Sequence, residues 1–323
     1  MLVVLGGYGE VGSAAVKTLT TWYPGEVVIA GRDAAKCAEL AQATGAIARP
    51  ADVTGDLDEV LAGATVAIMC VERDNERVAR ACLDKGIHYV DVSASPDVLD
   101  ALSALEPGKA TAMLAVGVAP GLSTLLAQRV LAALPSATHV DVTIQLGLGE
   151  HHGDDAVRWT VGTLATAKAR GRIHPVLPSF GKRTAFAFPF AGHDHLGVPV
   201  TTYLCFDSAL ATRALFGLRA LGVFALARRL RAERLAASAL SAFHFGTADF
   251  VVQAEAVSGT RRIGNAVSGN GQGQATGVIA ALVARQLREG EHEPGIRYPA
   301  YSDDVIGRLG QHGMTDHGLR EVE

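Results

Sequence analysis

Short apolar runs alternate with segments of helical spacing over the first 122 residues of the chain. The apolar runs predict strands at residues 2–5, 27–30, 46–51, 65–71, 88–93 and 112–116. The segments between them predict helices at residues 13–21, 34–43, 57–61 and 76–85. This repetition predicts a doubly wound parallel sheet, the Rossmann arrangement of an α/β protein.

The rhythm changes after residue 122. A helix is predicted at residues 122–134, strands at 139–146, 183–187 and 198–206, a hairpin of 250–257 with 262–267, and a helix at 274–287. The glycines of residues 269–273 are predicted to form a turn into this last helix. A second phosphate loop is the alternative, but no strand–helix–strand unit surrounds it. The tail beyond about residue 289 is predicted to be irregular.

Composition supports a compact protein of two domains. The chain has 323 residues, of which 49% are hydrophobic and 19% are charged, and its net charge of −4 offers no broad attraction for nucleic acid. Its four cysteines form no CxxC pair, which predicts reduced thiols and no structural zinc. The first residues lack the pattern of a secretion signal, so we expect a cytoplasmic protein.

One apolar stretch, residues 214–227, bears on membrane contact. Arg219 interrupts it and further arginines flank it, which falls short of an uncharged membrane span. We therefore expect a helix packed on protein and no membrane partner, with contact at a membrane surface as the alternative.

The strongest chemical signal is a glycine loop between the first predicted strand and the first helix. Gly7, Gly9 and Gly12 satisfy GxGxxG. Glycines there allow a tight turn, let the backbone approach a pyrophosphate and let the helix lie close to the strand. The alternative is an ordinary glycine turn, but the position within a βαβ unit favours a dinucleotide site.

Arg32 suggests which dinucleotide binds. It follows the end of the second predicted strand, 20 residues after Gly12, near where NAD sites usually place an acid that binds the ribose hydroxyls. A guanidinium there suits a 2′-phosphate, so NADP is favoured and NAD is less expected. The alternative is that Arg32 is a surface charge and that Asp33 binds the ribose, although Asp33 is also placed to cap the following helix.

The chain resembles the saccharopine dehydrogenase-like family, which includes saccharopine reductases and carboxynorspermidine dehydrogenases. Five segments carry the resemblance: residues 6–12 (GGYGEVG), 30–33 (AGRD), 51–54 (ADVT), 86–93 (GIHYVDVS) and 117–122 (GVAPGL). It implies an NADP(H)-dependent oxidoreductase and a homodimer. It also implies a Rossmann domain over residues 1–122, an α+β mixed-sheet substrate and dimerisation domain over 123–270, and a C-terminal helix and tail over 271–323 that return to the Rossmann domain.

The glycine loop, the end of the second strand and the resemblance together predict a set of cofactor contacts, formed by Gly7, Tyr8, Gly9, Glu10, Val11, Gly12, Arg32, Asp33, Asp52, Val53, Cys70, Val71, Ser93, Ala94 and Gly117. The resemblance alone implies the contacts from Asp52 onward. Asp52 and Val53 would border the adenine, Cys70 and Val71 would line the cofactor cleft, and Ser93, Ala94 and Gly117 would approach the nicotinamide. Alternatively, Asp52 caps a turn, and Val53 and Val71 are core residues. Residues 71–75 depart from the family because they are more charged than its usual small loop.

The sequence offers fewer candidates for catalytic residues than for cofactor contacts. Asp91 ends a central strand, where it either contacts the substrate or orients backbone or ribose. His152 and Arg158, together with Asp154, are candidates for facing a polar substrate, and Arg158 is suited to bind a carboxylate through paired hydrogen bonds. The alternative is an exposed surface. No metal is expected at the histidine pairs of residues 151–152 and 193–195, because neither has a third ligand at a diagnostic spacing.

Hydride transfer to a C=N bond of an amino-acid-derived or specialised metabolite, or its reverse, is the leading functional hypothesis. An iminium already carries the positive charge that hydride neutralises, so positioning suffices without a general acid. Reduction of C=C or C=O, or a non-catalytic NADP-binding sensor, are the alternatives.

Overall fold

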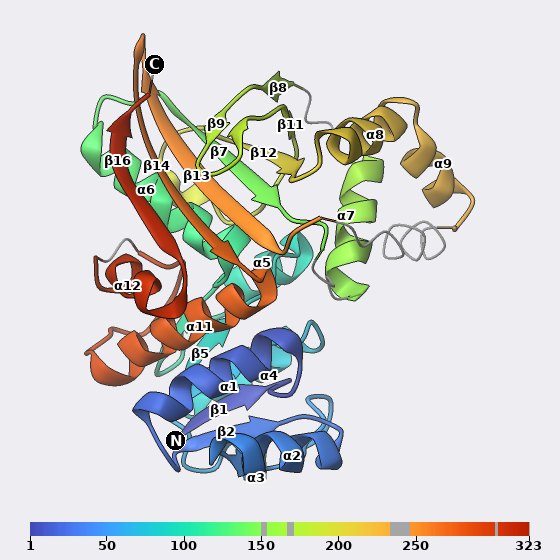
Figure 1. Cartoon of the computed structure of the whole chain (residues 1–323). Helices are drawn as coiled ribbons and strands as arrows, with labels where there is room; N and C mark the ends of the chain where they lie inside the picture. Colours follow the sequence, from blue (N-terminus) through green and yellow to red (C-terminus); the bar gives the residue numbers. More distant parts are fainter. Residues whose placement is uncertain (150–153, 167–170, 233–245, 301–302, 323) are drawn as a thin grey trace. The chain divides into compact units, whose positions relative to one another are not determined.

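The computed structural model in Figure 1 describes residues 1–149, 154–166, 171–232, 246–300 and 303–322. The chain forms two compact units. Unit 1 combines Met1–Thr124 with Gly273–Arg308, and unit 2 combines Leu125–Gln272 with Leu309–Glu323. Each unit is built around a sheet of its own.

Unit 1 contains a seven-stranded sheet in the order β15-β6-β5-β4-β1-β2-β3, and every neighbouring pair is parallel. Its strands are β1 Leu2–Leu5, β2 Val27–Ala30, β3 Ile47–Ala48, β4 Val66–Met69, β5 His88–Asp91, β6 Thr111–Met113 and β15 Gly295–Arg297. The predicted doubly wound parallel sheet is confirmed. The order of the strands reverses between β1 and β4, and sheets of this kind have their ligand crevice outside the carboxyl ends of the strands at such a switch point.

Helices connect the strands of unit 1: α1 Glu10–Trp22, α2 Ala34–Thr44, α3 Asp58–Leu61, α4 Asn75–Asp84 and α5 Pro96–Ser103. The C-terminal helix α11 (Gln272–Glu289) also packs here, as the family resemblance led us to expect. Its Gly277 lies so close to α1 that a Cβ atom there would come within 2.7 Å of the Ala14 Cβ. The pattern of the sequence missed α5 and β15.

Unit 2 contains a seven-stranded mixed sheet in the order β16-β14-β13-β7-β12-β11-β8, as expected for the second domain. Its strands are β7 His139–Leu146, β8 Arg172–Ile173, β11 Ala185–Ala187, β12 Val200–Phe206, β13 Asp249–Ser258, β14 Arg261–Asn270 and β16 Thr315–Glu321. The sheet is mixed because β7 and β12 are parallel and the other pairs are antiparallel. A small hairpin, β9 Val176–Leu177 with β10 Gly181–Lys182, forms a separate two-stranded sheet.

The end of the chain differs from the prediction. Residues 309–323 belong to unit 2, because β16 pairs antiparallel with β14, and only the part up to Arg308 belongs to unit 1. The tail is also regular rather than irregular, since it forms β15, helix α12 (Asp303–Arg308) and β16. β16 is an edge strand whose side chains are exposed or half-buried, so it lacks the apolar alternation that would have revealed it.

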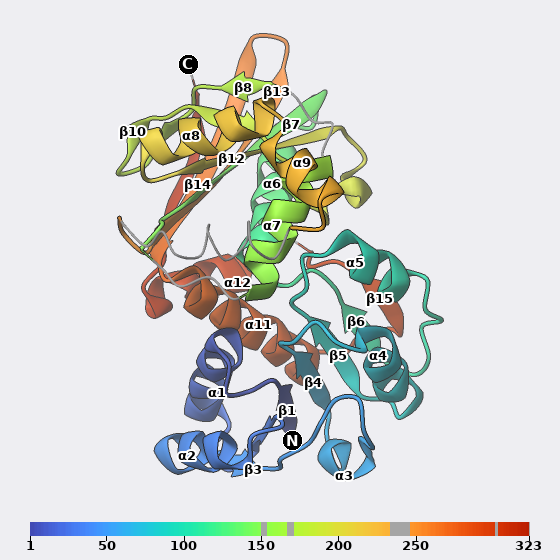
Figure 2. The same ribbon diagram turned by 90° about the vertical axis from the view of Figure 1, so that its right-hand side faces the viewer.

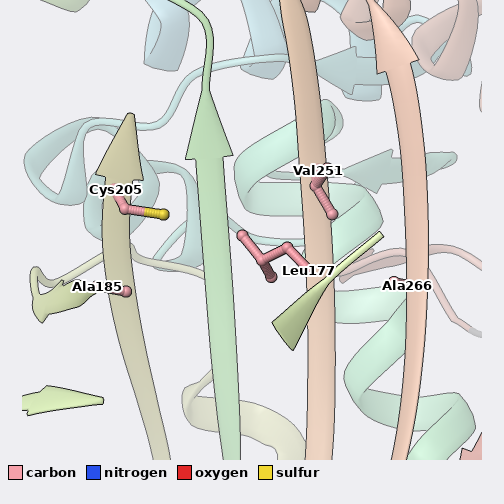
Figure 3. Packing of buried hydrophobic residues seen from close by; sticks show 5 residues of the cluster. All are labelled: Leu177, Ala185, Cys205, Val251 and Ala266. Atoms are coloured by element: carbon pink, nitrogen blue, oxygen red, sulfur yellow. The ribbon is translucent and has the colours of Figure 1, made fainter. Parts of the chain in front are cut away.

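One face of the second sheet holds a hydrophobic cluster (Figure 3). Cys205 of β12 and Val251 of β13 lie on either side of β7, and Ala266 of β14 and Ala185 of β11 extend the row. Leu177 from the small hairpin lies over this row and is 2% exposed. The hairpin therefore covers one face of the sheet.

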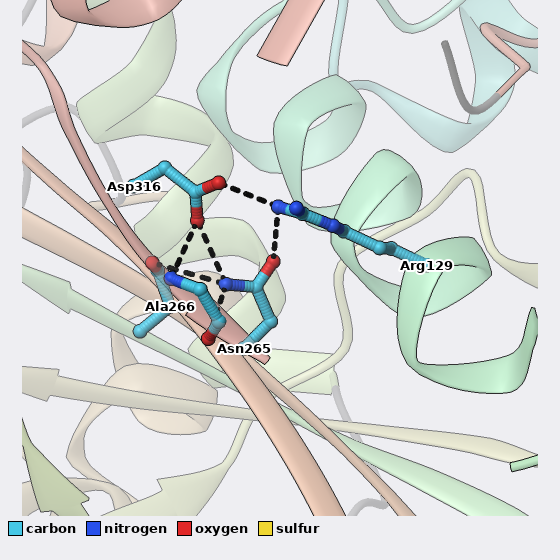
Figure 4. A network of polar contacts seen from close by, with 5 residues as sticks. Arg129, Asn265, Ala266 and Asp316 are labelled. Atoms are coloured by element: carbon cyan, nitrogen blue, oxygen red, sulfur yellow. Dashed lines mark hydrogen bonds and ion pairs between the residues drawn. The ribbon is translucent and has the colours of Figure 1, made fainter. Parts of the chain in front are cut away.

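Helix α6 (Ser123–Ala133) is fastened to β14 and β16 by a polar network (Figure 4). Arg129 donates to Asp316 Oδ2 over 2.5 Å and to Asn265 Oδ1 over 3.2 Å. The Asn265 amide donates to Asp316 Oδ1 over 2.8 Å and to the Gly318 carbonyl oxygen over 2.9 Å. The network lies where the register of β14 against β16 shifts, and it satisfies the polar groups at this irregularity.

Helices α7 (Asp154–Thr166), α8 (Ala209–Ala220) and α9 (Val223–Arg229) also belong to unit 2. No single helix of the described residues is long and apolar enough to cross a membrane, although α8 and α9 together, bent by 54°, reach the required length and composition. The apolar stretch is therefore two helices rather than one.

Replacing Asp316 by Ala is expected to lower the free energy of unfolding by roughly 1–3 kcal/mol, because Arg129 and Asn265 lose a charged partner. Burial alone would raise the pKa of Asp316, but hydrogen bonds from Asn265 and Arg129 outweigh it and lower this pKa below 3.8. A lowered carboxyl pKa adds stability above the unfolded value and loses it as the pH falls through the folded value. The difference from wild type, measured by denaturant unfolding, should therefore be constant near neutral pH and shrink below pH 3.8.

Glu321→Ala is the matched control on the same strand. Glu321 pairs with Arg261, and both side chains are mostly exposed, so its loss should change the unfolding free energy by less than about 1 kcal/mol. Equal effects of the two substitutions would contradict the structural role of the network.

Candidate functional site

The glycine loop lies between β1 and α1, as predicted. Gly9 is the N-cap of α1, and the first intrahelical donor is the Ser13 N–H, which bonds to the Gly9 carbonyl oxygen over 2.8 Å. The N–H groups of residues 10–12 therefore precede the hydrogen-bonded ladder and point out of the helix end. Such an end is suited to bind a pyrophosphate.

Two glycines permit the close packing that this geometry needs. A Cβ at Gly12 would collide with the Gly6 carbonyl oxygen and lie 2.8 Å from the Gly7 Cα. A Cβ at Gly7 would lie 2.9 Å from the Val4 carbonyl oxygen. At Gly9 the nearest atom would be the Gly6 carbonyl oxygen, 3.3 Å away, and this residue is exposed, so protein packing limits Gly9 less than it limits Gly7 and Gly12.

The side chains of the loop point in different directions. Tyr8 lies against Gly31 at the end of β2, where a Cβ would be 2.9 Å from the Tyr8 Cδ1. Glu10 lies against Gly273 in the first turn of α11, where a Cβ would be 2.9 Å from the Glu10 Cγ. Val11 is half-buried. The contribution of Glu10 and Val11 to a cofactor site would therefore come from their backbone.

The end of β2 separates the roles of Arg32 and Asp33. Asp33 is the N-cap of α2, and its Oδ1 accepts from the Lys36 N–H over 3.1 Å, as the sequence suggested. The Arg32 side chain is exposed beside it. Because the Asp33 carboxylate already serves the helix, Arg32 is the better candidate to bind a ribose substituent.

Asp52 and Val53 follow β3. Asp52 Oδ1 accepts 2.9 Å hydrogen bonds from both the N–H and the hydroxyl of Thr54, which lower the pKa of this carboxyl. The turn-capping alternative is therefore present in the structure. Val53 is 7% exposed and belongs to the core, and its carbonyl oxygen accepts from Arg77. An adenine contact by either residue remains a prediction.

The end of β4 reaches the glycine loop. A Cβ at Gly6 would lie 2.6 Å from the Val71 Cγ1 and 3.4 Å from the Cys70 carbonyl carbon. Val71 is 37% exposed, so the core alternative does not describe it. Burial raises the pKa of the Cys70 thiol to about 12, and the charge of Asp91 acts in the same direction, so this thiol stays protonated. β1 and β4 therefore place their ends together at the crevice.

Asp91, at the end of β5, is the centre of a buried polar network. Its carboxylate accepts from the Tyr89 hydroxyl over 2.6 Å, from the Asn75 amide over 2.8 Å and from the Ser93 N–H over 2.8 Å. The Asn75 amide also donates to the Ser93 hydroxyl over 3.2 Å. Asp91 has no exposed surface, so of its two predicted roles the structure favours orientation of the backbone over substrate contact.

Sequence reasoning missed Asn75, although it begins α4 in the charged loop that departs from the family pattern. It is 4% exposed, and its Oδ1 has no hydrogen-bond partner among the described residues. An amide that joins β5 to the start of α4 fixes the loop after β4. The only signal in the sequence was a polar residue at a helix start, which is too common to stand out.

The predicted nicotinamide side is formed by Ser93, Ala94 and Gly117. Ser93 is 7% exposed and Ala94 is half-buried, both directly after β5. Gly117 precedes an irregular turn at Val118–Leu122. A Cβ atom at Gly117 would lie 3.1 Å from the Thr276 Cγ2 of α11. These residues follow neighbouring strands of one sheet, and their contact with a nicotinamide remains a prediction.

The candidate substrate residues are only partly described. His152 lies outside the described residues, and Asp154 and Arg158 lie in α7 without described side chains. One residue further along α7, Trp159 meets Phe188 and Phe190, with ring centroids 5.5 Å apart in both pairs. The sequence pattern did not single out this aromatic cluster, because Trp159 lies about 30 residues before Phe188 and Phe190.

No group of three His, Cys, Asp or Glu side chains is arranged to hold a metal in the part of the chain that the structure describes. His193, from the second histidine pair, is 5% exposed, and burial lowers its pKa. The first pair, at residues 151–152, is outside the described ranges.

Comparison with known proteins agrees with this geometry. Residues 2–113 match the family described as the saccharopine dehydrogenase NADP binding domain. The match covers β1 to β6 and includes the glycine loop, Arg32 and the Asp91 network. A search of curated proteins finds no match.

Two solved structures share the whole fold. Saccharopine dehydrogenase (L-Glu forming) from Saccharomyces cerevisiae, in its apo form, is 17% identical with a TM-score of 0.66, and the alignment covers 100% of this chain and 99% of that chain. A probable dehydrogenase from Thermotoga maritima is 9% identical with a TM-score of 0.51 and 98% coverage of both chains. At these identities the likeness establishes the fold.

Gly9→Val is expected to weaken NADPH binding by roughly 100-fold or more, because the branched side chain would occupy the space where phosphate oxygens meet the helix N–H groups. The melting temperature should hardly change, since Gly9 has an ordinary φ of −70° and is exposed. Calorimetric titration with NADPH and thermal unfolding measure the two effects.

Gly12→Val is the contrasting variant, which should lower the melting temperature because its side chain collides with Gly6. Unchanged NADPH affinity in Gly9→Val would contradict the assignment of the loop.

Arg32→Ala is expected to weaken NADP binding by roughly 10- to 100-fold and NAD binding very little, because only NADP carries the 2′-phosphate. Lys17→Ala removes another exposed cation, from α1, and should leave both affinities unchanged. Equal losses for the two dinucleotides in Arg32→Ala would rule out the phosphate contact.

Proposed function

We propose that this chain is an oxidoreductase that transfers hydride between NADPH and a C=N bond. The match of residues 2–113 to the saccharopine dehydrogenase NADP binding domain supports the cofactor and the class of reaction. The substrate class we propose is an imine of an amino-acid-derived or specialised metabolite. The reverse oxidation of the corresponding amine belongs to the same proposal.

The residues present suit the dinucleotide. Gly7 and Gly12 leave room for a tight turn under the helix end, and the N–H groups of residues 10–12 are directed out of it. Arg32 is exposed at the end of β2 for the 2′-phosphate. Val71 and Cys70 lie beside the loop, where the crevice between β1 and β4 opens. The bound nicotinamide supplies the hydride.

The observation that carries the choice of a C=N bond is the burial of the ionisable groups described at the ends of β4 and β5, where Asp91 has no exposed surface and already accepts from three donors. The Tyr89 hydroxyl donates to Asp91, and burial, with the charge of Asp91, raises the pKa of Tyr89 well above its usual value. The Cys70 thiol has a pKa of about 12. These groups hold their protons, which suits a reaction that draws no proton from them.

The electron balance of the reaction explains why this matters. When hydride adds to the carbon of an iminium, the π electrons become the lone pair on nitrogen and cancel its positive charge. A ketone would instead become an alkoxide, which needs a proton from an acid in the site. An enone needs a proton at carbon. Reduction of an iminium therefore requires only that the substrate is bound and oriented, and the protein can accelerate it by positioning the substrate against the nicotinamide.

Asp91, Asn75 and Ser93 then act as positioning residues. Asp91 fixes the Ser93 backbone, and Asn75 ties the start of α4 to both residues. These contacts make rigid the loops that follow β4 and β5. Rigid loops keep the reacting atoms in one relative geometry, which is where a large part of the rate enhancement of such reactions arises.

The proposal is tested by following NADPH absorbance with purified protein and a matched set of cyclic imines, enones and ketones. Imines are expected to be reduced, with a rate that follows the fraction of substrate protonated on nitrogen. Gly9→Val serves as the control and should abolish turnover.

Reduction of enones or ketones while imines stay inert would contradict the C=N assignment. Tight NADPH binding without turnover of any of these substrates would favour a sensor of the NADP pool.

A further inference from the structure

Helix α8 is apolar on two opposite faces. One face packs inside unit 2 through Thr212, Leu215 and Phe216, and Phe216 stacks on Phe186 of β11 at 4.6 Å between ring centroids. The other face is exposed and runs along Leu210, Ala214, Gly217, Leu218 and Leu221. The spacing of four, three, one and three residues keeps these positions on one side of a helix of 3.6 residues per turn.

Helix α9 carries a second exposed stripe. Val223, Leu226 and Leu230 recur at intervals of three and four residues, and they are 42%, 55% and 67% exposed. Gly222, with a φ of 75°, joins the two helices in the left-handed conformation that glycine adopts readily. We call the eight positions of both stripes the leucine stripe, and Figure 2 shows α8 and α9 following each other along one side of unit 2.

Exposed large apolar side chains are concentrated on α8 and α9. Six of the nine large apolar side chains that are exposed among the described residues belong to the leucine stripe. Scattered exposed leucines need no explanation, but a contiguous patch marks a surface that binds a partner or a membrane.

Charge narrows the choice of partner. Residues 209–232 contain five arginines and no acidic residue, a local net charge of +5 in a chain whose overall charge is −4. Arg213, Arg228, Arg229 and Arg231 are exposed alongside the leucine stripe. The surface therefore combines leucine side chains with positive charge, which is the composition of helices that lie in the interface of anionic membranes.

A second copy of this chain fits the surface poorly. Symmetric pairing of the stripe would bring two patches of charge +5 together, and like charges in an interface weaken binding. A protein partner is also less well matched, because binding hot spots are rich in tryptophan and tyrosine and poor in leucine. The two aromatic residues of this segment, Phe216 and Phe224, are both buried.

We propose that the leucine stripe binds the surface of membranes that contain anionic lipids, with α8 and α9 lying in the plane of the interface. Crossing the membrane would separate Phe216 from Phe186 and place Arg213 and Arg219 in hydrocarbon. Lying in the interface keeps the packed face of α8 on the protein. The arginines then meet lipid headgroups, and the leucines enter the acyl boundary.

The test is flotation of the full chain with vesicles of phosphatidylcholine alone and with vesicles that also contain phosphatidylglycerol. Binding is expected on the second kind and should fall with added salt. Leu221→Ser with Leu226→Ser should reduce the partition coefficient about tenfold for each leucine removed. Arg228→Gln, Arg229→Gln and Arg231→Gln together should reduce it roughly 100-fold.

Val176→Ser with Leu319→Ser is the matched control, because these side chains are 60% and 46% exposed in the same unit but lie outside the stripe. It should bind vesicles as wild type does. All variants should keep the NADPH affinity of wild type, which shows that they are folded. Failure of the wild type to float with the anionic vesicles, equal binding to both vesicles, or equal losses in the control would overturn the proposal. A change of the leucine variant from dimer to monomer in size-exclusion chromatography would overturn it in favour of a second copy.

Discussion

The candidate cofactor site depends on the close approach of α1 to the end of β1. Gly12 meets the Gly6 carbonyl oxygen at a distance that leaves no room for a Cβ, and this contact sets the position of the helix end. Because the first-turn N–H groups cannot bond within the helix, their direction follows from the direction of α1. The proposed position of a pyrophosphate thus depends on backbone packing rather than on a charged side chain.

The strands beside β1 each bring further residues to the same end of the sheet. β2 brings Arg32 and the capped start of α2, β4 brings Val71 against Gly6, and β5 brings Asp91. Asp91 is a buried carboxylate, and such a group is costly unless it is hydrogen-bonded. Three donors satisfy it, and two of them, from Asn75 and Ser93, belong to the segments after β4 and β5. The same bonds that compensate the burial of the charge therefore hold the loops of the crevice.

Unit 2 uses polar and apolar contacts for different tasks. The small hairpin covers one face of the sheet through the apolar cluster, and the Arg129 network holds α6 on the edge strand β16. Among the described residues, α8 packs on the unit through its inner face, and its outer face keeps leucines exposed beside arginines. A helix of this kind stabilises the unit on one side and offers a binding surface on the other.

The sequence by itself determined the strands of unit 1 from β1 to β6 and the helices between them except α5, because buried parallel strands are continuous apolar runs and glycines mark the turn between β1 and α1. It also indicated the cap at Asp33, since capping is a local interaction. Only the tertiary structure decided that β16 joins the second sheet, that Asn75 reaches Asp91, and that one face of α8 stays exposed. Each of these depends on contacts between segments far apart in the chain or on what covers a helix, and no local pattern of residues encodes either.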